Sequence, residues 1–128
     1  MSTIGDVMVR ELVTVDEGTP IIEACRIMGV RHIGAILVTR DGRIHGIFTE
    51  RDLLSRVLAG GVDLDTPVGD LATSPLITVD PATPIRMAAR VMADMHVKRL
   101  AVVEDGEVVG IFTSSDLADV IGESPLDF

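Results

Sequence analysis

Aromatic side chains and cysteine are scarce in this chain. Aromatic residues make up 2% of the 128, and there is no Trp and no Tyr. A buried core must therefore be built mainly from Ile, Val, Leu, Ala and Met. Cys25 is the only cysteine, which excludes an internal disulfide. It falls at helical spacing from Ile21 and Met28, so we predict a buried, inert thiol.

Positive charge is also in short supply. Eleven Lys and Arg face 20 Asp and Glu, which leaves a formal net charge of −9, and Lys98 is the only lysine. Such a balance repels polyanions, so we expect neither nucleic acid nor an anionic membrane surface as a partner. No apolar run approaches the ~20 residues of a membrane span. The N-terminus lacks a basic-then-apolar signal peptide. We expect a soluble, cytoplasmic protein.

Motifs of catalysis and metal binding are missing as well. The sequence contains no H-E-x-x-H, no P-loop and no G-x-S-x-G. Its three histidines, His32, His45 and His96, have no metal-ligand spacing. We therefore expect no enzyme activity, no metal and no cofactor.

What the chain does contain is a stretch used twice. Residues 46–53 read GIFTERDL and residues 110–117 read GIFTSSDL, an offset of 64. The same offset relates His32 to His96, which favours a scaffold role for both. Internal repetition on this scale organises a fold. We predict two repeats, residues 1–62 and 63–128. Each is near the size at which a lone core is marginal, so we expect one module.

Each repeat has the same predicted order, β-α-β-β-α. In the first, a short strand at 12–15 precedes a helix that opens at Thr19-Pro20, with Thr as N-cap and Pro as first helical residue. An apolar strand at 33–39, a tight turn at Asp41-Gly42 and a returning strand at 43–48 follow. A helix from Thr49 ends the repeat near 58. The second repeat places its elements at 76–79, 84–95, 99–103, 107–112 and 114–121, with a frayed tail from Gly122 to Phe128.

This duplicated order resembles a pair of cystathionine-β-synthase (CBS) domains, a Bateman module, over about residues 3–122. Four features carry the resemblance, where h is a hydrophobic residue: the short h-x-T-V strand, the T-P helix start, the D-G turn and the closing G-h-h-T-x-x-D segment. The resemblance implies an α/β (α+β) fold whose two repeats pack about a pseudo-twofold axis, with two clefts between them. It also implies adenosyl ligands in those clefts, disc-shaped homodimers, and a stand-alone form common in bacteria and archaea.

The recurring Thr-x-x-Asp segment has two compatible interpretations. Thr49 and Asp52, like Thr113 and Asp116, form the pattern of a capping box at a helix start. The second interpretation, drawn from the family, is a nucleoside grip. The Thr hydroxyl would contact ribose or phosphate, and the ionised Asp would accept hydrogen bonds from vicinal ribose hydroxyls. The preceding glycine would let the ligand approach the backbone.

The two clefts implied by the resemblance are unequal. Lys98-Arg99 precedes the apolar strand of the second repeat, where a phosphate would be held; the first repeat has Gly34-Ala35 there. We rank first the cleft with the basic pair, made of Thr113, Asp116, Lys98, Arg99, Leu12, Val13, Thr14, Ile33, Gly34 and Gly110. The second cleft comprises Thr49, Asp52, Leu76, Ile77 and Val97, where Arg51 could partly replace the basic pair or point to solvent.

The sequence therefore predicts a non-catalytic sensor. It would bind AMP, ADP, ATP or a related adenosyl compound and act on an unidentified effector protein. The alternative is a purely structural dimerisation module with empty clefts. Sensing of divalent cations ranks last, because the acidic residues are scattered.

Overall fold

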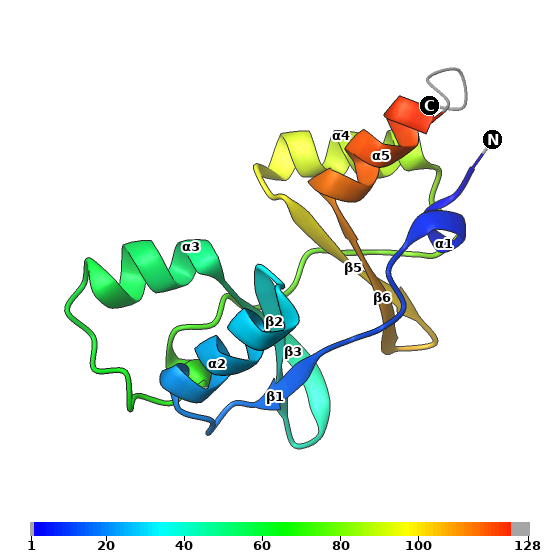
Figure 1. Cartoon of the computed structure of the whole chain (residues 1–128). Helices are drawn as coiled ribbons and strands as arrows, with labels where there is room; N and C mark the ends of the chain where they lie inside the picture. Colours follow the sequence, from blue (N-terminus) through cyan, green and yellow to red (C-terminus); the bar gives the residue numbers. More distant parts are fainter. Residues whose placement is uncertain (1, 124–128) are drawn as a thin grey trace. The chain divides into compact units, whose positions relative to one another are not determined.

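The computed structural model describes residues 2–123 and has a mixed α+β fold (Figure 1). It contains two compact units. The first unit is Val13–Leu76; the second combines the chain up to Leu12 with the chain from Ile77 onward. Each unit holds a three-stranded sheet, in the order β1-β2-β3 or β4-β5-β6. The predicted fold class is confirmed.

In the first unit, β1 pairs parallel with β2, and β2 pairs antiparallel with β3. The turn between β2 and β3 has positive φ at Asp41 and Gly42, 52° and 78°, which confirms the predicted tight turn. The elements are β1 Thr14–Asp16, α2 Ile21–Arg31, β2 Ala35–Arg40, β3 Arg43–Thr49, α3 Glu50–Asp52, the π-helical continuation η1 Leu53–Leu58 and the 3-10 helix η2 Val68–Asp70.

The second unit repeats this order. Its elements are α1 Ile4–Val7, β4 Thr78–Val79, α4 Ile85–Met95, β5 Arg99–Glu104, β6 Glu107–Thr113 and α5 Ser114–Glu123. The last helix is α-helical throughout, whereas its counterpart becomes π-helical after Asp52. Because α5 includes Gly122 and Glu123, the prediction that the tail frays from Gly122 was wrong there. Residues 124–128 lie outside the described part.

A short lead-in segment completes each unit, and it comes from the other repeat. Residues 3–9 pack on the second unit: Ile4 N–H donates to the Thr83 carbonyl at 2.8 Å, and Val9 exchanges hydrogen bonds with Ile111 at 2.9 Å. Residues 67–73, which stand 64 positions later, pack on the first unit in the same way, and Thr73 exchanges hydrogen bonds with Ile47. Thus each sequence repeat contributes its strands and helices to one unit and its lead-in to the other.

Each unit has its own apolar core between its sheet and its helices. The first includes Ile21, Val38 and Phe48; the second includes Ile4 and Phe112, and all five are fully buried. Aliphatic residues dominate, as predicted, yet the two Phe of the recurring GIFT stretch are the largest fully buried side chains. The repeated stretch therefore anchors both cores.

The helix starts differ from the prediction. Pro20, with ψ of 143°, is the N-cap of α2, and no side chain caps that helix, so the N-cap assigned to Thr19 was wrong. Its first two N–H groups donate instead to the carbonyls of Thr66 and Leu64, at 2.9 and 3.0 Å. Backbone carbonyls of residues 64 and 66 satisfy these donors, which leaves no need for a hydroxyl.

The two histidines that the repeat relates, His32 and His96, occupy equivalent places in the two units. His32 ends α2 and His96 ends α4, each in the left-handed conformation with φ of 55° and 54°. A residue in this conformation turns the chain out of a helix. Each histidine thus ends its helix and lets the chain turn toward the central strand of its sheet.

Candidate functional site

The Thr113–Asp116 segment forms where β6 ends and α5 begins. Thr113 N–H donates to Asp116 Oδ2 at 2.9 Å, and Asp116 N–H donates to Thr113 Oγ1 at 3.2 Å. These reciprocal bonds confirm the predicted capping box. Asp116 is half-buried, and among the residues described its Oδ1 accepts no hydrogen bond. One carboxylate oxygen is therefore left for an external donor.

The basic pair lies beside this segment within the same unit. Arg99 is the register partner of Thr113 across β5 and β6, and Ser114 N–H donates to the Lys98 carbonyl at 2.9 Å. Lys98 is exposed and Arg99 is half-buried. Sheet pairing thus brings the only lysine and an arginine next to the Thr and Asp that sequence reasoning singled out.

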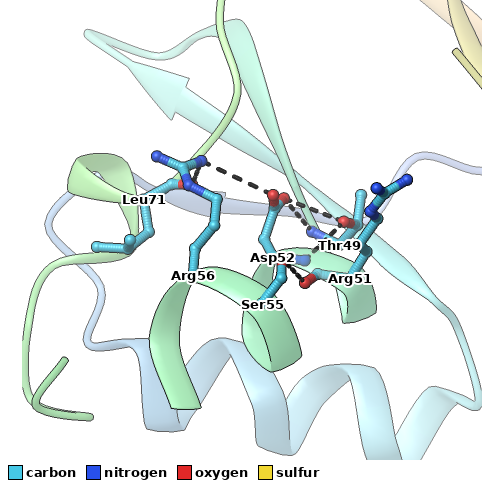
Figure 2. Close-up of polar contacts among 6 residues, drawn as sticks. All are labelled: Thr49, Arg51, Asp52, Ser55, Arg56 and Leu71. Atoms are coloured by element: carbon cyan, nitrogen blue, oxygen red, sulfur yellow. Dashed lines mark hydrogen bonds and ion pairs between the residues drawn. The ribbon is translucent and has the colours of Figure 1, made fainter. Parts of the chain in front are cut away.

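The Thr49–Asp52 segment has the same capping box, but the Asp52 carboxylate has more contacts than that of Asp116 (Figure 2). Asp52 Oδ2 accepts from Thr49 N–H at 2.9 Å and from the Thr49 hydroxyl at 3.0 Å. Its Oδ1 lies 3.7 Å from the Arg56 guanidinium, whose Nη1 donates to the Leu71 carbonyl at 2.5 Å. Sequence reasoning missed Arg56, although its position four residues after Asp52 on a helix was the available signal.

The remaining predicted cleft residues are distributed over both units. Leu12, Ile77 and Val97 belong to the second unit, and Val13, Thr14, Ile33, Gly34 and Leu76 to the first. Two carbonyls are already used inside their sheets, because Val13 accepts from Leu37 N–H and Ile77 accepts from Ala101 N–H. That these residues join the Thr-x-x-Asp segments in two clefts stays a prediction.

Gly46 and Gly110 pack against the lead-ins. A Cβ on Gly110 would lie 2.4 Å from Met8 Sδ and 3.1 Å from the Val9 carbonyl oxygen. A Cβ on Gly46 would lie 3.0 Å from the Thr73 carbonyl oxygen. The close approach expected from these glycines is thus made by the chain itself, and contact of Gly110 with a ligand stays a prediction.

A groove of about 450 Å³ lies between α2 and α3 of the first unit. It is lined by Cys25, Met28, Gly29, His32, Ile33, Glu50 and Leu53. Cys25 is half-buried, not fully buried as predicted, and burial raises the pKa of its thiol. A raised pKa keeps the thiol protonated at neutral pH, which agrees with an inert cysteine.

Two features of residues 2–123 concern metal binding and membranes. No group of three or more His, Cys, Asp or Glu side chains is arranged to hold a metal ion within this range. Nor does any helix in the described part have the length and apolarity to cross a membrane.

Two units of one β-α-β-β-α order, each closing on a Thr-x-x-Asp helix start, define a tandem-repeat α+β protein. The family model described as "CBS domain" matches residues 4–59 and again residues 68–123. The chain therefore belongs to the CBS domain family, as a tandem pair of such domains. The resemblance inferred from the sequence is confirmed.

Relatives of similar length support this assignment. The CBS domain-containing protein YhcV of Bacillus subtilis is 34% identical over 118 residues, which cover 92% of this chain and 84% of that protein. An uncharacterized conserved protein from Pyrococcus horikoshii has a solved structure with a TM-score of 0.88 and 36% identity, covering 93% of this chain and 91% of that one.

Two related structures carry adenosine derivatives. The CBS domain protein PAE2072 from Pyrobaculum aerophilum, complexed with AMP, has a TM-score of 0.80 and 29% identity, with 89% of this chain and 88% of that chain covered. The CBS domain pair of protein MJ0100, in complex with 5′-methylthioadenosine and S-adenosyl-L-methionine, has a TM-score of 0.85 and 25% identity, with 96% and 98% covered.

Proposed function

We propose that this protein is a non-catalytic regulatory module that binds an adenosyl ligand, such as AMP, ADP or ATP, between its two repeats. The observation that carries the proposal is the Asp116 carboxylate, with one oxygen unpaired among the described residues, next to Lys98 and Arg99. The adenosine derivatives bound by PAE2072 and MJ0100 support the ligand class.

Each part of such a ligand has a matching group in the protein. The free oxygen of Asp116 can accept hydrogen bonds from ribose hydroxyls. Lys98 and Arg99 can hold a phosphate, and such charge-assisted bonds each contribute ~1.5–3 kcal/mol. With no Trp and no Tyr in the chain, adenine would lie between aliphatic side chains and bond to backbone groups.

Binding would regulate by shifting the arrangement of the two units, or of two copies of the chain, in a way that an effector protein recognises. A ligand moves such an equilibrium only by its differential affinity for the two states. We place this function in the cytoplasm and assign no catalytic step to the module.

Equilibrium calorimetry tests the proposal directly. AMP, ADP, ATP and S-adenosyl-L-methionine would each be titrated up to millimolar concentration. We expect saturable binding of at least one, and a loss of about tenfold in nucleotide affinity for Lys98→Gln, in keeping with one charged hydrogen bond. Arg26→Gln is the charge-matched control, because Arg26 is exposed and pairs with Glu23 on the same helix. No heat with any of the four compounds would refute the proposal.

We also propose that the chain pairs as a homodimer. Large apolar side chains stand exposed on α2 and η1: Val30 is 80% exposed, Leu54 63% and Leu58 56%. Exposed apolar groups of this size favour association. In sedimentation experiments, we expect the wild type to be a dimer and the Leu54→Asp variant to be a monomer.

The structural alternative makes a different prediction in the same solution. A dimerisation module with empty clefts would sediment as a dimer whose melting temperature no adenosyl compound changes. A compound that binds only the folded state must raise that temperature. Thermal shift measured on the dimer therefore separates the regulatory function from the structural one.

A further inference from the structure

Both oxygens of the Asp52 carboxylate face groups of its own unit. Asp52 is the one charged residue among those described whose side chain is buried, with 12% of the side chain exposed. Thr49 supplies two hydrogen bonds to Oδ2, and the Arg56 guanidinium faces Oδ1 (Figure 2). Oδ2 thus accepts two hydrogen bonds, and Oδ1 faces a cation at 3.7 Å, so a ligand that bonds to Oδ1 must compete with Arg56.

Arg56 is held in place from its other side. Its Nη1 donates to the carbonyl of Leu71 at 2.5 Å, just beyond the 3-10 helix Val68–Asp70. Leu71 is a buried residue, and a carbonyl in such a place needs a donor. The guanidinium therefore bridges a buried carbonyl and a buried carboxylate, which restricts the motion of a long side chain.

The equivalent place in the second unit is not occupied in this way. Four residues after Asp116 stands Val120, whose side chain has no charge and no hydrogen-bond donor. Among the residues described, no cation forms an ion pair with Asp116. Two Thr-x-x-Asp segments with the same capping box therefore differ in what their carboxylates face.

We propose that Arg56 competes with ligands for the carboxylate of Asp52. It thereby makes the Thr49–Asp52 site disfavour nucleosides that carry no phosphate. This inference rests on the proposed function and extends it from Asp116 to Asp52, whose carboxylate would also accept hydrogen bonds from ribose hydroxyls. A nucleoside without phosphate has no anionic group that could replace Asp52 as the partner of Arg56. It must displace the guanidinium from Asp52 to reach Oδ1, and so it binds more weakly than at Asp116.

The test isolates this site and uses adenosine as the probe. Asp116→Asn removes the ionised acceptor of the other site, and Arg56→Met is added to remove the competitor. Adenosine is titrated by calorimetry, and amide NMR shifts near Thr49 locate the binding. We expect a gain of about two- to fivefold in adenosine affinity at Asp52, the range that a partly exposed ion pair supports. Arg26→Met in the same background is the control for the lost charge, and we expect no gain from it.

Unchanged or weaker adenosine binding near Thr49 after Arg56→Met would overturn the inference. Arg56→Gln, which keeps a donor for the Leu71 carbonyl but no charge, is the second variant if the Met variant loses stability. It is expected to change affinity in the same direction. Failure of the proposed function is separate, because it appears as no binding near Thr113 in the wild type, whatever Arg56 does.

The ion pair itself is tested without any ligand. In a double-mutant cycle of Asp52→Asn and Arg56→Met, urea unfolding of the ligand-free protein measures the coupling of the two side chains. We expect a coupling of about two- to fivefold in the unfolding equilibrium constant. Additive effects would mean that Arg56 does not engage Asp52 in solution, which also overturns the inference.

Discussion

Met8 packs directly onto Gly110, so that a Cβ on this glycine would lie 2.4 Å from the sulfur and 2.9 Å from Cγ of Met8. Met8 belongs to the lead-in and Gly110 to β6. The two residues are far apart in the sequence, and folding brings them into contact. Because Met8 is buried beside Ile4 in the core of the second unit, the glycine is where the lead-in closes that core.

Gly110→Ala is therefore expected to destabilise the protein. The added methyl group would overpack the contact with Met8, at a cost of about 1–3 kcal/mol in the free energy of unfolding. Urea denaturation measures the loss. Gly29→Ala is the matched control, because nothing lies within 4 Å of a Cβ there and Gly29 is within α2. Alanine should stabilise that helix by about 0.5–1 kcal/mol. Equal effects of the two substitutions would contradict the packing described for Gly110.

Ile4→Ala should weaken the second unit. Ile4 is fully buried and its N–H donates to the Thr83 carbonyl, so truncation leaves a cavity that costs about 2–5 kcal/mol. We expect hydrogen exchange to quicken chiefly in β5, β6 and α4. Arg26→Ala, at an exposed side chain of α2, should have little effect. Exchange that quickens mainly between Val13 and Leu76 would show that the lead-in packs elsewhere.

Asp116→Ala and Asp52→Ala form a matched pair for ligand affinity. Each removes one capping box, and thus about 1 kcal/mol of stability. In the proposals made above, Asp116 offers the ligand a carboxylate oxygen without competition, whereas Arg56 competes for the oxygen of Asp52. We expect Asp116→Ala to weaken AMP or ATP binding by about tenfold or more, and Asp52→Ala by much less, measured by calorimetry. Equal losses would mean that the ranking of the two sites is wrong.

Cys25 should react slowly with thiol reagents. Burial raises the pKa of its thiol, so at a given pH a smaller fraction is the reactive thiolate. At pH 8, alkylation by iodoacetamide followed by mass spectrometry should be slower in the folded protein than in the urea-unfolded chain. Reaction at the same rate in both states would show an open, unshifted thiol. The rate should approach that of the unfolded chain as the pH rises through the raised pKa.

Much of the local structure could be predicted because its causes are local. The tight turn at Asp41-Gly42 follows from residues that accept positive φ, and the Thr49–Asp52 capping box from one short segment. The proximity of Lys98 and Arg99 to Thr113 was implied by the resemblance to CBS domains, and the register of β5 and β6 pairs Arg99 with Thr113. These features made the candidate site visible in the sequence.

Other features depend on partners far along the chain. The carbonyl of Thr66 takes the place expected for the Thr19 hydroxyl at the start of α2, and no local pattern indicates that exchange. The same holds for Arg56, which meets Asp52 on one side but the distant Leu71 carbonyl on the other. The contact with the distant Leu71 carbonyl, which holds Arg56 in place beside Asp52, is visible only in the folded chain.

The two lead-ins stand at different sequence distances from the units that they complete. The first unit is one uninterrupted stretch, Val13–Leu76, because its lead-in at residues 67–73 directly follows its strands and helices. The second unit needs residues 3–9, which lie far from Ile77 along the chain. Contacts between segments so distant in sequence carry a larger loop-closure entropy. We therefore expect the first unit to close early in folding and the second unit to close later.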